Sequence, residues 1–289
     1  MKITKAVIPA AGIGTRFLPW SKAMPKEMLP IVDKPVIQYV VEECVNSGIK
    51  DIIIVTSYHK RAIEDYFDSL PELERHLEKQ GKTEKLEMIR KISHLANFIF
   101  IRQKGPYGNA SPVLSAKHVI GNDPFAVLWG DQFVWATPPR LKQCLKVAEK
   151  LNAPVIAGLI VPDEIIPSRG MCDIEPYKQG LYKLKSIIEK PSVKESPSKL
   201  AAYGTYVLTP DIIPALESLK PGKDGELWLV DAINEVCKNR LTLAVELKNA
   251  KLYDAGNKLI YHRTVIDFML KDKEIGKKML QYLKEKVCK

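Results

Sequence analysis

Apolar and polar positions follow two patterns along the first half of the chain. Short apolar runs bounded by turn residues predict buried strands, and apolar residues that recur every three or four positions predict amphipathic helices. The predicted strands cover residues 6–9, 52–56, 98–101, 125–129 and 154–161, and the predicted helices cover 35–45, 62–67, 72–93, 111–118 and 139–151. Because strands that alternate with helices form βαβ units, this pattern predicts an α/β fold with a parallel sheet.

The pattern changes after Asp163 toward shorter β elements. The strands predicted there cover 171–174, 184–188, 202–208 and 241–247, and the helices cover 210–219, 228–237 and 258–270. The last residues, 271–289, have apolar residues at helical spacing among many lysines, which indicates a further amphipathic helix. Neither an internal repeat nor a low-complexity linker interrupts the sequence, so 289 residues fit one large domain or a core with an appended lobe.

The formal net charge of +10 allows an anionic partner, either a macromolecule or a small molecule. The basic residues are scattered, however, and the densest cluster lies in 271–289, where a solvated helix face explains it better than a nucleic-acid site. No apolar run approaches the roughly 20 residues that span a bilayer, and the chain enters its first strand without a signal-peptide core. We therefore expect a cytoplasmic protein that binds neither nucleic acid nor a membrane.

Several other chemistries lack their sequence signals. The five cysteines are Cys44, Cys144, Cys172, Cys237 and Cys288. Their number is odd and no Cys-x-x-Cys pair occurs, so the pattern predicts reduced, mostly buried thiols rather than a disulfide framework or a zinc ribbon. The histidines lack metal-ligand spacing, and no Gly-x-Ser-x-Gly elbow is present. The sequence therefore disfavours a covalent hydrolase and a zinc enzyme.

The first predicted strand ends in a loop with two glycines, and cations follow it. Gly12 and Gly14 allow the backbone to approach a ligand closely, and free N–H groups in such a loop bind phosphate oxygens. Arg16 and Lys26 match phosphate charge. The spacing fits neither the dinucleotide fingerprint, which needs a third glycine where Phe17 stands, nor the Walker A loop. The loop favours a polyphosphate ligand, although glycines at a strand–helix turn can also serve turn geometry alone.

Two predicted strands end in a carboxylate. Asp131 follows the run 125–129, and Asp254 stands in residues 251–257, which offer a second strand end. A carboxylate at the carboxyl edge of a parallel sheet commonly holds Mg²⁺ against phosphates, because this hard ion prefers oxygen ligands. A helix cap or an Asx turn is the alternative at Asp131.

Several short motifs resemble those of the sugar-nucleotide pyrophosphorylases, a family of nucleotidyltransferases. They are residues 10–16 (AAGIGTR), 25–30 (PKEMLP), 33–35 (DKP), Gln103, 130–131 (GD), 189–191 (EKP) and 254–258 (DAGNK), and the likeness runs from about Lys2 to Phe268. The resemblance implies a Rossmann-like, mostly parallel sheet flanked by helices, with a small β-rich sugar-binding part. It divides a single nucleotidyltransferase domain, 1–289, into a mainly nucleotide-binding part (1–160), a mainly sugar-binding part (161–256) and C-terminal helices (257–289).

The resemblance also implies a reaction. Members of this family join a sugar-1-phosphate to a nucleoside triphosphate with Mg²⁺ and release pyrophosphate, and the likeness is greatest to bacterial members that use UTP and glucose-1-phosphate. The attacking group is already a phosphate anion, so positioning and charge neutralisation suffice without a protein nucleophile. A homodimer or homotetramer is expected. Two alternatives stay open: a glucose-1-phosphate thymidylyltransferase, which the Gly-Asp-Gln triplet at 130–132 resembles, and a non-catalytic paralogue that senses a ligand.

Individual site residues follow from the resemblance. Arg16 is expected to neutralise the β- and γ-phosphates, and Lys26 to bridge the α-phosphate and the attacking sugar phosphate. Asp131 and Asp254 are expected to ligate Mg²⁺. The remaining assignments place Ala10, Ala11, Gly12, Gly14, Gln103 and Gly108 around the nucleotide, and Gly170, Glu189, Lys190, Gly204 and Thr205 around the sugar phosphate.

Three segments depart from the pattern of the UTP-using members. The base-reading loop is Pro106-Tyr107-Gly108-Asn109-Ala110, where the pattern usually has Gly-Leu-Gly-His-Ala. Arg169 stands where the pattern usually has Tyr before a glycine, and Thr205 stands where it has Arg. The first departure bears on the choice between uracil and thymine. The added cation at Arg169 favours, as a hypothesis, a sugar with a carboxylate or another anion.

Overall fold

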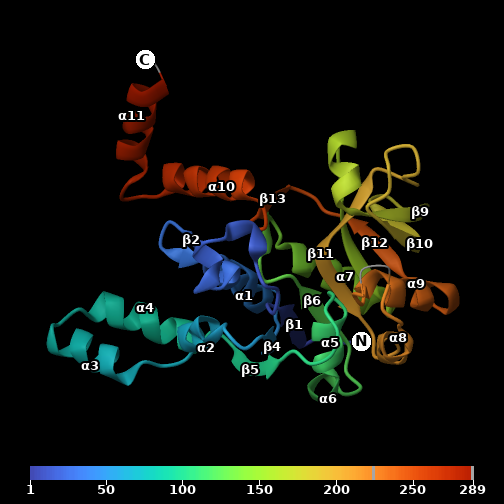
Figure 1. Ribbon diagram of the computed structural model, residues 1–289, viewed down its shortest axis with the longest axis horizontal. Coiled ribbons are helices and arrows are strands. Elements are labelled where there is room, and N and C mark those ends of the chain that lie inside the picture. Colours follow the sequence, from blue (N-terminus) through green and yellow to red (C-terminus); the bar gives the residue numbers. More distant parts are fainter. Residues whose placement is uncertain (223–224, 288–289) are drawn as a thin grey trace.

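The computed structural model describes residues 1–222 and 225–287, with a nine-stranded sheet at the centre (Figure 1). The strand order is β5-β4-β1-β6-β11-β8-β12-β10-β9. These strands are β1 (Lys5–Pro9), β4 (Asp51–Thr56), β5 (Asn97–Arg102), β6 (Phe125–Leu128), β8 (Val155–Ile160), β9 (Gly170–Lys178), β10 (Leu181–Glu189), β11 (Leu200–Leu208) and β12 (Leu243–Glu246).

Most strands of this sheet point the same way. β5, β4, β1 and β6 run parallel to one another, and so do β8 and β12. β11 runs antiparallel between these two groups, and β10 and β9 form an antiparallel hairpin at the far edge. Only β11 and β10 are therefore reversed, which confirms the predicted α/β class with a mostly parallel sheet. The carboxyl ends of β1, β4, β5 and β6 meet at one edge, where ligands bind in such sheets.

The β9–β10 hairpin returns toward the centre of the sheet. β9 also pairs with β11, through Met171 and Ala201, so the five strands from β11 to β9 form a closed circuit of neighbours. Such curling follows from the twist of adjacent strands, which accumulates across a sheet. As a result, the start of β9 and the end of β10, where Gly170 pairs with Glu189, lie near β11 rather than at a remote edge.

Helices cover both faces of the sheet. α1 (Val36–Asn46), α2 (Arg61–Phe67) and α7 (Arg140–Leu151) pack on one face, and α5 (Ser111–Ser115), α6 (Lys117–Ile120), α8 (Ile212–Ser218) and α9 (Leu229–Asn239) pack on the other. Side chains alternate along a strand, and in β1 Ala6 and Ile8 join the first core while Val7 joins the second. A strand buried on both faces is apolar throughout, which explains the continuous apolar runs of the sequence.

The structure differs most from the predicted elements in two places, and it also divides the helix predicted at 111–118 into α5 and α6. Residues 72–93 form two helices, α3 (Pro71–Lys79) and α4 (Thr83–Ser93), which project from the body (Figure 1). Gly81, with a φ of 65°, lies in the turn between them. The second difference is β7 (Gln132–Ala136), a strand that the pattern did not predict, which pairs antiparallel with β13 (Ala250–Asp254) in a separate two-stranded sheet.

Short elements complete the carboxyl edge of the sheet and its surroundings. They are the 3₁₀ helices η1 (Thr15–Phe17), η2 (Trp20–Lys22), η3 (Lys26–Met28) and η4 (Asp163–Ser168), and the strands β2 (Pro30–Ile31) and β3 (Lys34–Pro35). The first three of these helices follow the glycine loop after β1, so Arg16 and Lys26 lie in short helical turns.

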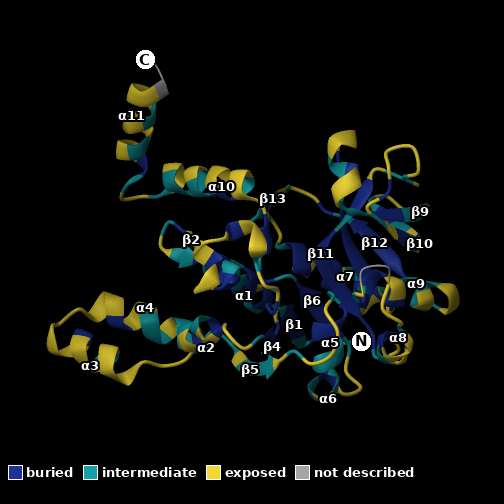
Figure 2. Ribbon diagram, viewed as in Figure 1, coloured by how far each residue is buried: buried dark blue, intermediate teal, exposed yellow. Residues whose placement is uncertain are grey.

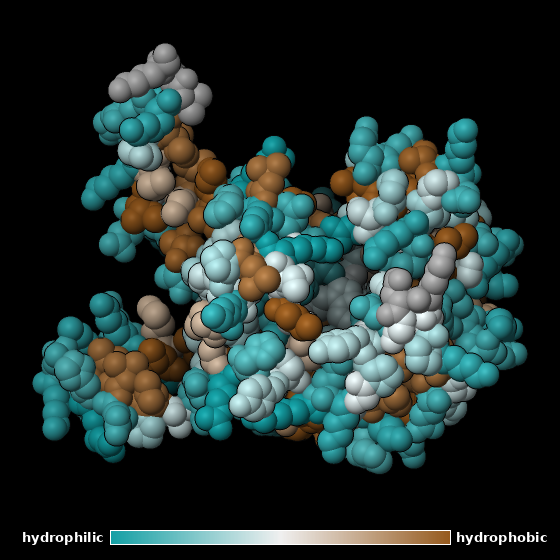
Figure 3. All heavy atoms as spheres, viewed as in Figure 1, coloured by the Kyte–Doolittle hydropathy of each residue, from teal (hydrophilic) through white to brown (hydrophobic). Residues whose placement is uncertain are grey.

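Two helices extend from the body at the end of the chain (Figure 1). α10 (Lys258–Lys271) and α11 (Gly276–Val287) match the helices predicted at 258–270 and within 271–289, whose last two residues lie outside the described part. Much of their surface is exposed (Figure 2), and hydrophobic residues lie on it (Figure 3), among them Leu270 and Leu280. Within residues 1–222 and 225–287, no helix has the length and apolar character needed to cross a membrane.

The cysteines bear out the predicted thiols. Cys44, Cys144 and Cys172 are buried, Cys237 is half-buried, and all four are free. Cys288 lies outside the described residues.

Candidate active site

A cavity of about 540 Å³ opens at the carboxyl ends of β1, β5 and β6. The predicted site residues that line it are Ala11, Gly12, Gly14, Arg16, Lys26, Gln103, Gly108, Asp131 and Asp254. Three parallel strands deliver most of these residues to one edge, as the sequence predicts. Asp254 arrives differently, from the end of β13 in the separate two-stranded sheet.

The glycine loop after β1 is fixed by main-chain contacts. The Ala10 N–H donates a hydrogen bond to the Val55 carbonyl oxygen at 2.8 Å. Gly14 has a φ of 77°, a conformation that favours glycine, and its carbonyl oxygen accepts from Ser21 Oγ at 2.7 Å. Ala10 is buried and does not line the cavity, so it shapes the loop from behind.

Lys26 and Asp131 form an ion pair in the cavity wall, with Lys26 Nζ 2.5 Å from Asp131 Oδ2. Burial lowers the pKa of Lys26, but the charges of Asp131 and Glu27 outweigh burial and raise this pKa above its usual value. Burial raises the pKa of Asp131, but the Lys26 charge outweighs it and lowers that pKa below its usual value. Both groups are therefore charged at neutral pH, and each neutralises the other.

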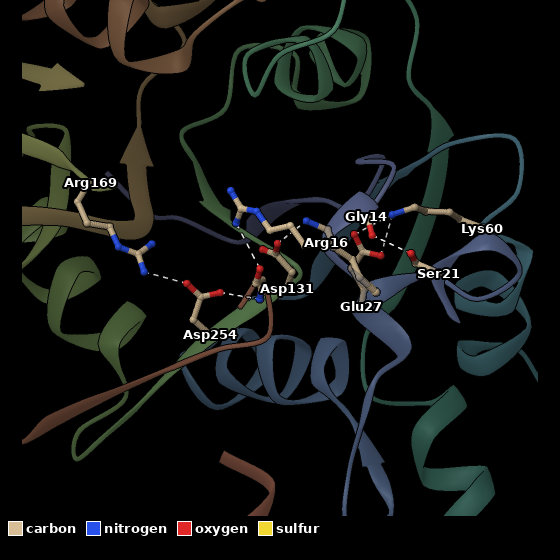
Figure 4. A network of polar contacts seen from close by, with 10 residues as sticks. Gly14, Arg16, Ser21, Glu27, Lys60, Asp131, Arg169 and Asp254 are labelled. Atoms are coloured by element: carbon tan, nitrogen blue, oxygen red, sulfur yellow. Dashed lines mark hydrogen bonds and ion pairs between the residues drawn. The ribbon is translucent and has the colours of Figure 1, made fainter. Parts of the chain in front are cut away.

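A second ion pair, between Arg169 and Asp254, lies beside Asp131 (Figure 4). Asp254 Oδ2 accepts from Arg169 Nη2 at 2.8 Å, and Asp254 Oδ1 accepts from the Gly256 N–H at 2.7 Å. The Gly256 carbonyl oxygen in turn accepts from Arg16 Nη1 at 3.3 Å. The turn after β13 thus connects a carboxylate of the site to a cation of the glycine loop.

The ladder between β7 and β13 brings the two carboxylates together. Asp254 pairs with Gln132, and the Ala255 N–H donates to the Asp131 carbonyl oxygen at 3.0 Å. A Cβ on Gly256 would lie 2.9 Å from Asp254 Oδ1 and 3.7 Å from Asp131 Oδ2, so both carboxylates face one small space. The part of the chain that the structure describes holds no cluster of three or more potential metal ligands. Two carboxylates nevertheless fit Mg²⁺, which usually binds one or two of them together with substrate phosphates and water.

A buried ion pair lies directly behind Lys26. Lys60 Nζ donates to both carboxylate oxygens of Glu27, at 2.8 and 2.7 Å, and each side chain is only 1% exposed. Glu27 follows Lys26 in η3, and Lys60 precedes α2 after the end of β4. The pair therefore ties the segment that bears Lys26 to the neighbouring strand.

The predicted base-reading loop is braced by the segment before α9. The Leu227 N–H donates to the Tyr107 carbonyl oxygen at 2.9 Å, and Asn109 Oδ1 accepts from the Leu229 N–H at 2.6 Å. Gly108 has a φ of 129°, and a Cβ there would lie 2.2 Å from the Leu227 carbonyl oxygen. Glycine is thus required at 108 by backbone packing, and Asn109 serves to anchor the first turn of α9.

Three predicted sugar-side residues, Gly170, Glu189 and Lys190, lie beside the cavity without lining it. A Cβ on Gly170 would lie 3.0 Å from Glu189 Oε2, across the β9–β10 hairpin. Lys190 Nζ lies 5.0 Å from the ring centre of Trp228, and Trp228 lines the cavity. Lys190 therefore lies next to a lining residue, Trp228, whereas Glu189 lies against Gly170, which follows the lining residue Arg169.

The last two sugar-side residues lie on β11. A Cβ on Gly204 would lie 2.2 Å from Gln132 Nε2, a side chain of the cavity wall, so Gly204 packs against this wall. Thr205 is fully buried and pairs with Leu128 in the sheet. The structure does not bring the Thr205 side chain to the cavity.

Sequence reasoning missed part of the cavity wall. The additional lining residues include Glu27, Tyr107, Trp129, Gln132, Glu226 and Trp228. Trp129 and Trp228 offer aromatic surfaces on which a base or a sugar can pack. Only their positions in the sequence could have indicated that they line the cavity. Trp129 directly precedes the Gly-Asp pair, and Trp228 begins the predicted helix 228–237.

The fold and the cavity define a class of protein. A glycine loop, two cations and two facing carboxylates at the carboxyl edge of an α/β sheet are what an enzyme of phosphoryl or nucleotidyl transfer needs. A family model described as Nucleotidyl transferase matches residues 5–268, and the chain belongs to this family. The match confirms the family that the sequence motifs indicate.

Individual relatives resemble nearly the whole chain. A UTP–glucose-1-phosphate uridylyltransferase of Bacillus subtilis is 47% identical over 282 residues, which are 98% of this chain and 96% of the relative. A UDP-glucose pyrophosphorylase complexed with UDP-glucose is similar with a TM-score of 0.84 and 38% identity, over 94% of this chain and 100% of that one. A UTP-bound UGPase from Acinetobacter baumannii has a TM-score of 0.87 and 36% identity, over 98% of this chain and 99% of that one. These similarities confirm the predicted fold.

Proposed function

We propose that this protein transfers the uridylyl group of UTP to glucose-1-phosphate, giving UDP-glucose and pyrophosphate. The observation that supports this most directly is the convergence of Arg16, Lys26, Asp131 and Asp254 on one cavity in a nucleotidyl transferase. The names of relatives that align over nearly the full length support UTP and glucose-1-phosphate as the substrates.

The proposed reaction is a displacement at the α-phosphorus of UTP. An oxygen of the sugar phosphate forms the new bond, the bond from the α-phosphorus to the bridging oxygen breaks, and pyrophosphate leaves with the electron pair. The nucleophile is already anionic, so the protein need not remove a proton. Its task is to hold both substrates in line and to neutralise their charges.

Two cations neutralise the phosphate charges of the substrates. Arg16, held by the turn at Gly256, binds the β- and γ-phosphates that leave. Lys26 exchanges its contact with Asp131 for the α-phosphate and the attacking phosphate, where its charge stabilises the transition state.

Asp131 and Asp254 are the residues that would hold a metal ion, which we propose to be Mg²⁺. Such an ion would neutralise phosphate charge when bound. Lys26 and Arg169, which neutralise these two carboxylates in the free protein, would then be available to anionic groups of the substrates.

The remaining predicted residues divide between the two substrates. Ala10, Ala11, Gly12, Gly14, Gln103 and Gly108 would form the nucleotide side, with Ala10 acting only from behind the loop. Gly170, Glu189, Lys190, Gly204 and Thr205 would form the sugar-phosphate side, with Thr205 acting only from within β11. We keep the proposed division of the single domain into a mainly nucleotide-binding part (1–160), a mainly sugar-binding part (161–256) and C-terminal helices (257–289). We further propose that the enzyme is cytoplasmic. We also propose that it forms a dimer or tetramer, and the exposed apolar residues of α10 and α11 support this oligomeric state.

The test is pyrophosphate release by the purified protein. Four nucleoside triphosphates are crossed with several sugar-1-phosphates in the presence of Mg²⁺, and each pairing is repeated with EDTA. UTP with glucose-1-phosphate should be the fastest pairing, and EDTA should abolish it. Faster release with dTTP would instead indicate a thymidylyltransferase, and no release in any pairing would indicate a ligand sensor.

A further inference from the structure

Arg169 occupies a position between the proposed metal carboxylates and the sugar side. It follows η4 and directly precedes β9, and its carbonyl oxygen accepts from the Lys190 N–H at 3.0 Å. Its own N–H donates to the Ile166 carbonyl oxygen at 3.2 Å. The backbone of Arg169 is therefore held at both ends, next to the Glu189–Lys190 pair, while its side chain lines the cavity.

The Arg169 guanidinium retains unused hydrogen-bonding capacity inside the cavity. Nη2 contacts Asp254 Oδ2 at 2.8 Å, and the guanidinium carbon lies 5.2 Å from the ring centre of Tyr203. Nε is buried, and in the described part of the chain it has no hydrogen-bond partner. A guanidinium offers five N–H donors in a planar fork that matches carboxylate and phosphate oxygens, and buried donors normally have partners. Among the described residues, Asp254 is the one hydrogen-bond acceptor of this guanidinium, and the side chain is 23% exposed, so a ligand in the cavity can supply acceptors to its terminal nitrogens.

The contact with Asp254 decides whether the Arg169 guanidinium is available to a ligand. Asp254 faces Asp131 across the space left by Gly256, and the proposed function assigns both carboxylates to a metal ion. When Asp254 ligates a metal, its charge is neutralised and its attraction for Arg169 weakens. Arg169 is then a partly buried cation on a cavity wall, beside the residues proposed to hold the sugar.

We propose that Arg169 determines specificity on the sugar side: Asp254 holds it in the free protein and, on ligating the metal, releases it to an anionic oxygen of the sugar substrate. This inference rests on the proposed assignment of Asp254. Two sources of the oxygen share this chemistry, namely the phosphate common to all sugar-1-phosphates and a carboxylate on a uronic acid. Arg169 differs in role from Lys26. Lys26 contacts both UTP and the sugar phosphate, whereas Arg169 contacts only the sugar substrate.

The first experiment measures binding of the sugar substrate by calorimetry in the presence of Mg²⁺. Glucose-1-phosphate and glucuronate-1-phosphate are titrated into the unchanged protein, Arg169→Gln, Arg169→Lys and, as a control, Arg90→Gln. Arg90 is also paired with a carboxylate, Glu74, but lies on the α3–α4 hairpin outside the cavity. Loss of a charged hydrogen bond should weaken binding about 10-fold or more in Arg169→Gln, with Arg169→Lys intermediate and Arg90→Gln unchanged.

The two ligands distinguish the sources of the oxygen. Equal weakening for both ligands assigns Arg169 to the phosphate, and weakening for glucuronate-1-phosphate alone assigns it to the carboxylate. Unchanged binding of both ligands to Arg169→Gln would overturn the proposal. UTP affinity should not fall in any variant, because a general distortion of the cavity would weaken UTP as well.

The second experiment measures Mn²⁺ binding by electron paramagnetic resonance without nucleotide or sugar. Arg169→Gln frees Asp254 and should bind Mn²⁺ more tightly than the unchanged protein, whereas Asp254→Asn should bind it more weakly. Equal Mn²⁺ affinity in Arg169→Gln and the unchanged protein would refute the exchange at Asp254. Neither experiment needs turnover, so absence of pyrophosphate release contradicts the proposed function and leaves these two results to decide on Arg169.

Discussion

At the scale of single residues, the site is arranged as pairs of opposite charge. Lys26 contacts Asp131 and Arg169 contacts Asp254, so each proposed metal ligand is neutralised by a cation while no ligand is bound. Two unpaired carboxylates in this space would repel each other and raise the free energy of the folded state. The cations therefore stabilise the free protein, and the same cations are available to phosphates when the carboxylates take another partner.

We predict that Lys26→Ala lowers turnover by roughly 100-fold or more, because it removes a charge that stabilises the transition state. The measurement is the rate of pyrophosphate release at saturating substrates. Lys22→Ala is the matched control, since Lys22 is an exposed lysine four residues earlier in the same chain of turns and should leave the rate unchanged. Turnover of Lys26→Ala close to that of Lys22→Ala would exclude the assigned role.

The pair formed by Glu27 and Lys60 has the opposite character, because it is wholly buried. Burial raises the pKa of Glu27 and lowers the pKa of Lys60, so each charge depends on its partner. We predict that Lys60→Met lowers the free energy of unfolding by about 3–5 kcal/mol, because it leaves an unpaired buried carboxylate. The double variant Glu27→Leu/Lys60→Met should regain most of this loss. Urea unfolding measures both, and a single variant as stable as the double variant would contradict the explanation.

At the scale of elements, the loop 106–110, which we predict to read the base, depends on backbone packing at Gly108. Gly108→Ala should weaken UTP binding about 10-fold, because the new Cβ collides with the Leu227 backbone and a non-glycine residue at positive φ is strained. Gly105→Ala is the control: Gly105 also has a positive φ, of 88°, but a Cβ there meets no atom within 4 Å. Calorimetry with UTP compares the two, and equal affinities would show that strain alone matters.

Most elements could be predicted from the sequence, because strands buried on both faces are continuous apolar runs. β1 and β4 are of this kind, and their alternate side chains enter the two cores. β7 could not be predicted in this way. Trp135 is exposed, and the partner of β7 is β13, far along the chain, so no local pattern announces the pairing. Residues 72–93 were predicted as one segment because both helices share the helical period, although Gly81 marks the break.

Site residues that follow strands with a local apolar pattern could be predicted, and contacts between distant segments could not. The glycine loop, Gln103 and Asp131 follow predicted parallel strands, whose carboxyl ends must share an edge, and they do line one cavity. The contact of Lys60 with Glu27 could not be predicted, because it joins segments whose side chains meet only after folding. Thr205 was assigned by its motif position, but a residue in the middle of a central strand points into the core.

At the scale of the whole molecule, the buried thiols report on the integrity of the core. Burial raises the pKa of Cys144 and of Cys172 to about 12, and it raises the pKa of Cys44 as well. In the variant Cys237→Ser/Cys288→Ser only these three thiols remain. We predict that iodoacetamide at pH 8 leaves them unmodified in the folded protein and modifies all three in urea, as mass spectrometry would measure. Modification in the folded protein would mean that the core opens.

Because β7 pairs with β13, the two carboxylates of the site come together only late in synthesis of the chain. The strands β1, β4, β5 and β6 leave the ribosome early and can pair with one another, as N-terminal segments generally do. Asp131 emerges with them, but Asp254 is translated only after β12, and the two carboxylates meet when the last ladder closes. A nascent chain therefore presents the glycine loop and its lysine well before it holds the paired carboxylates. Because the proposed mechanism needs both carboxylates, a chain that ends before Asp254 cannot complete the reaction, and the last strand, β13, is needed for catalysis.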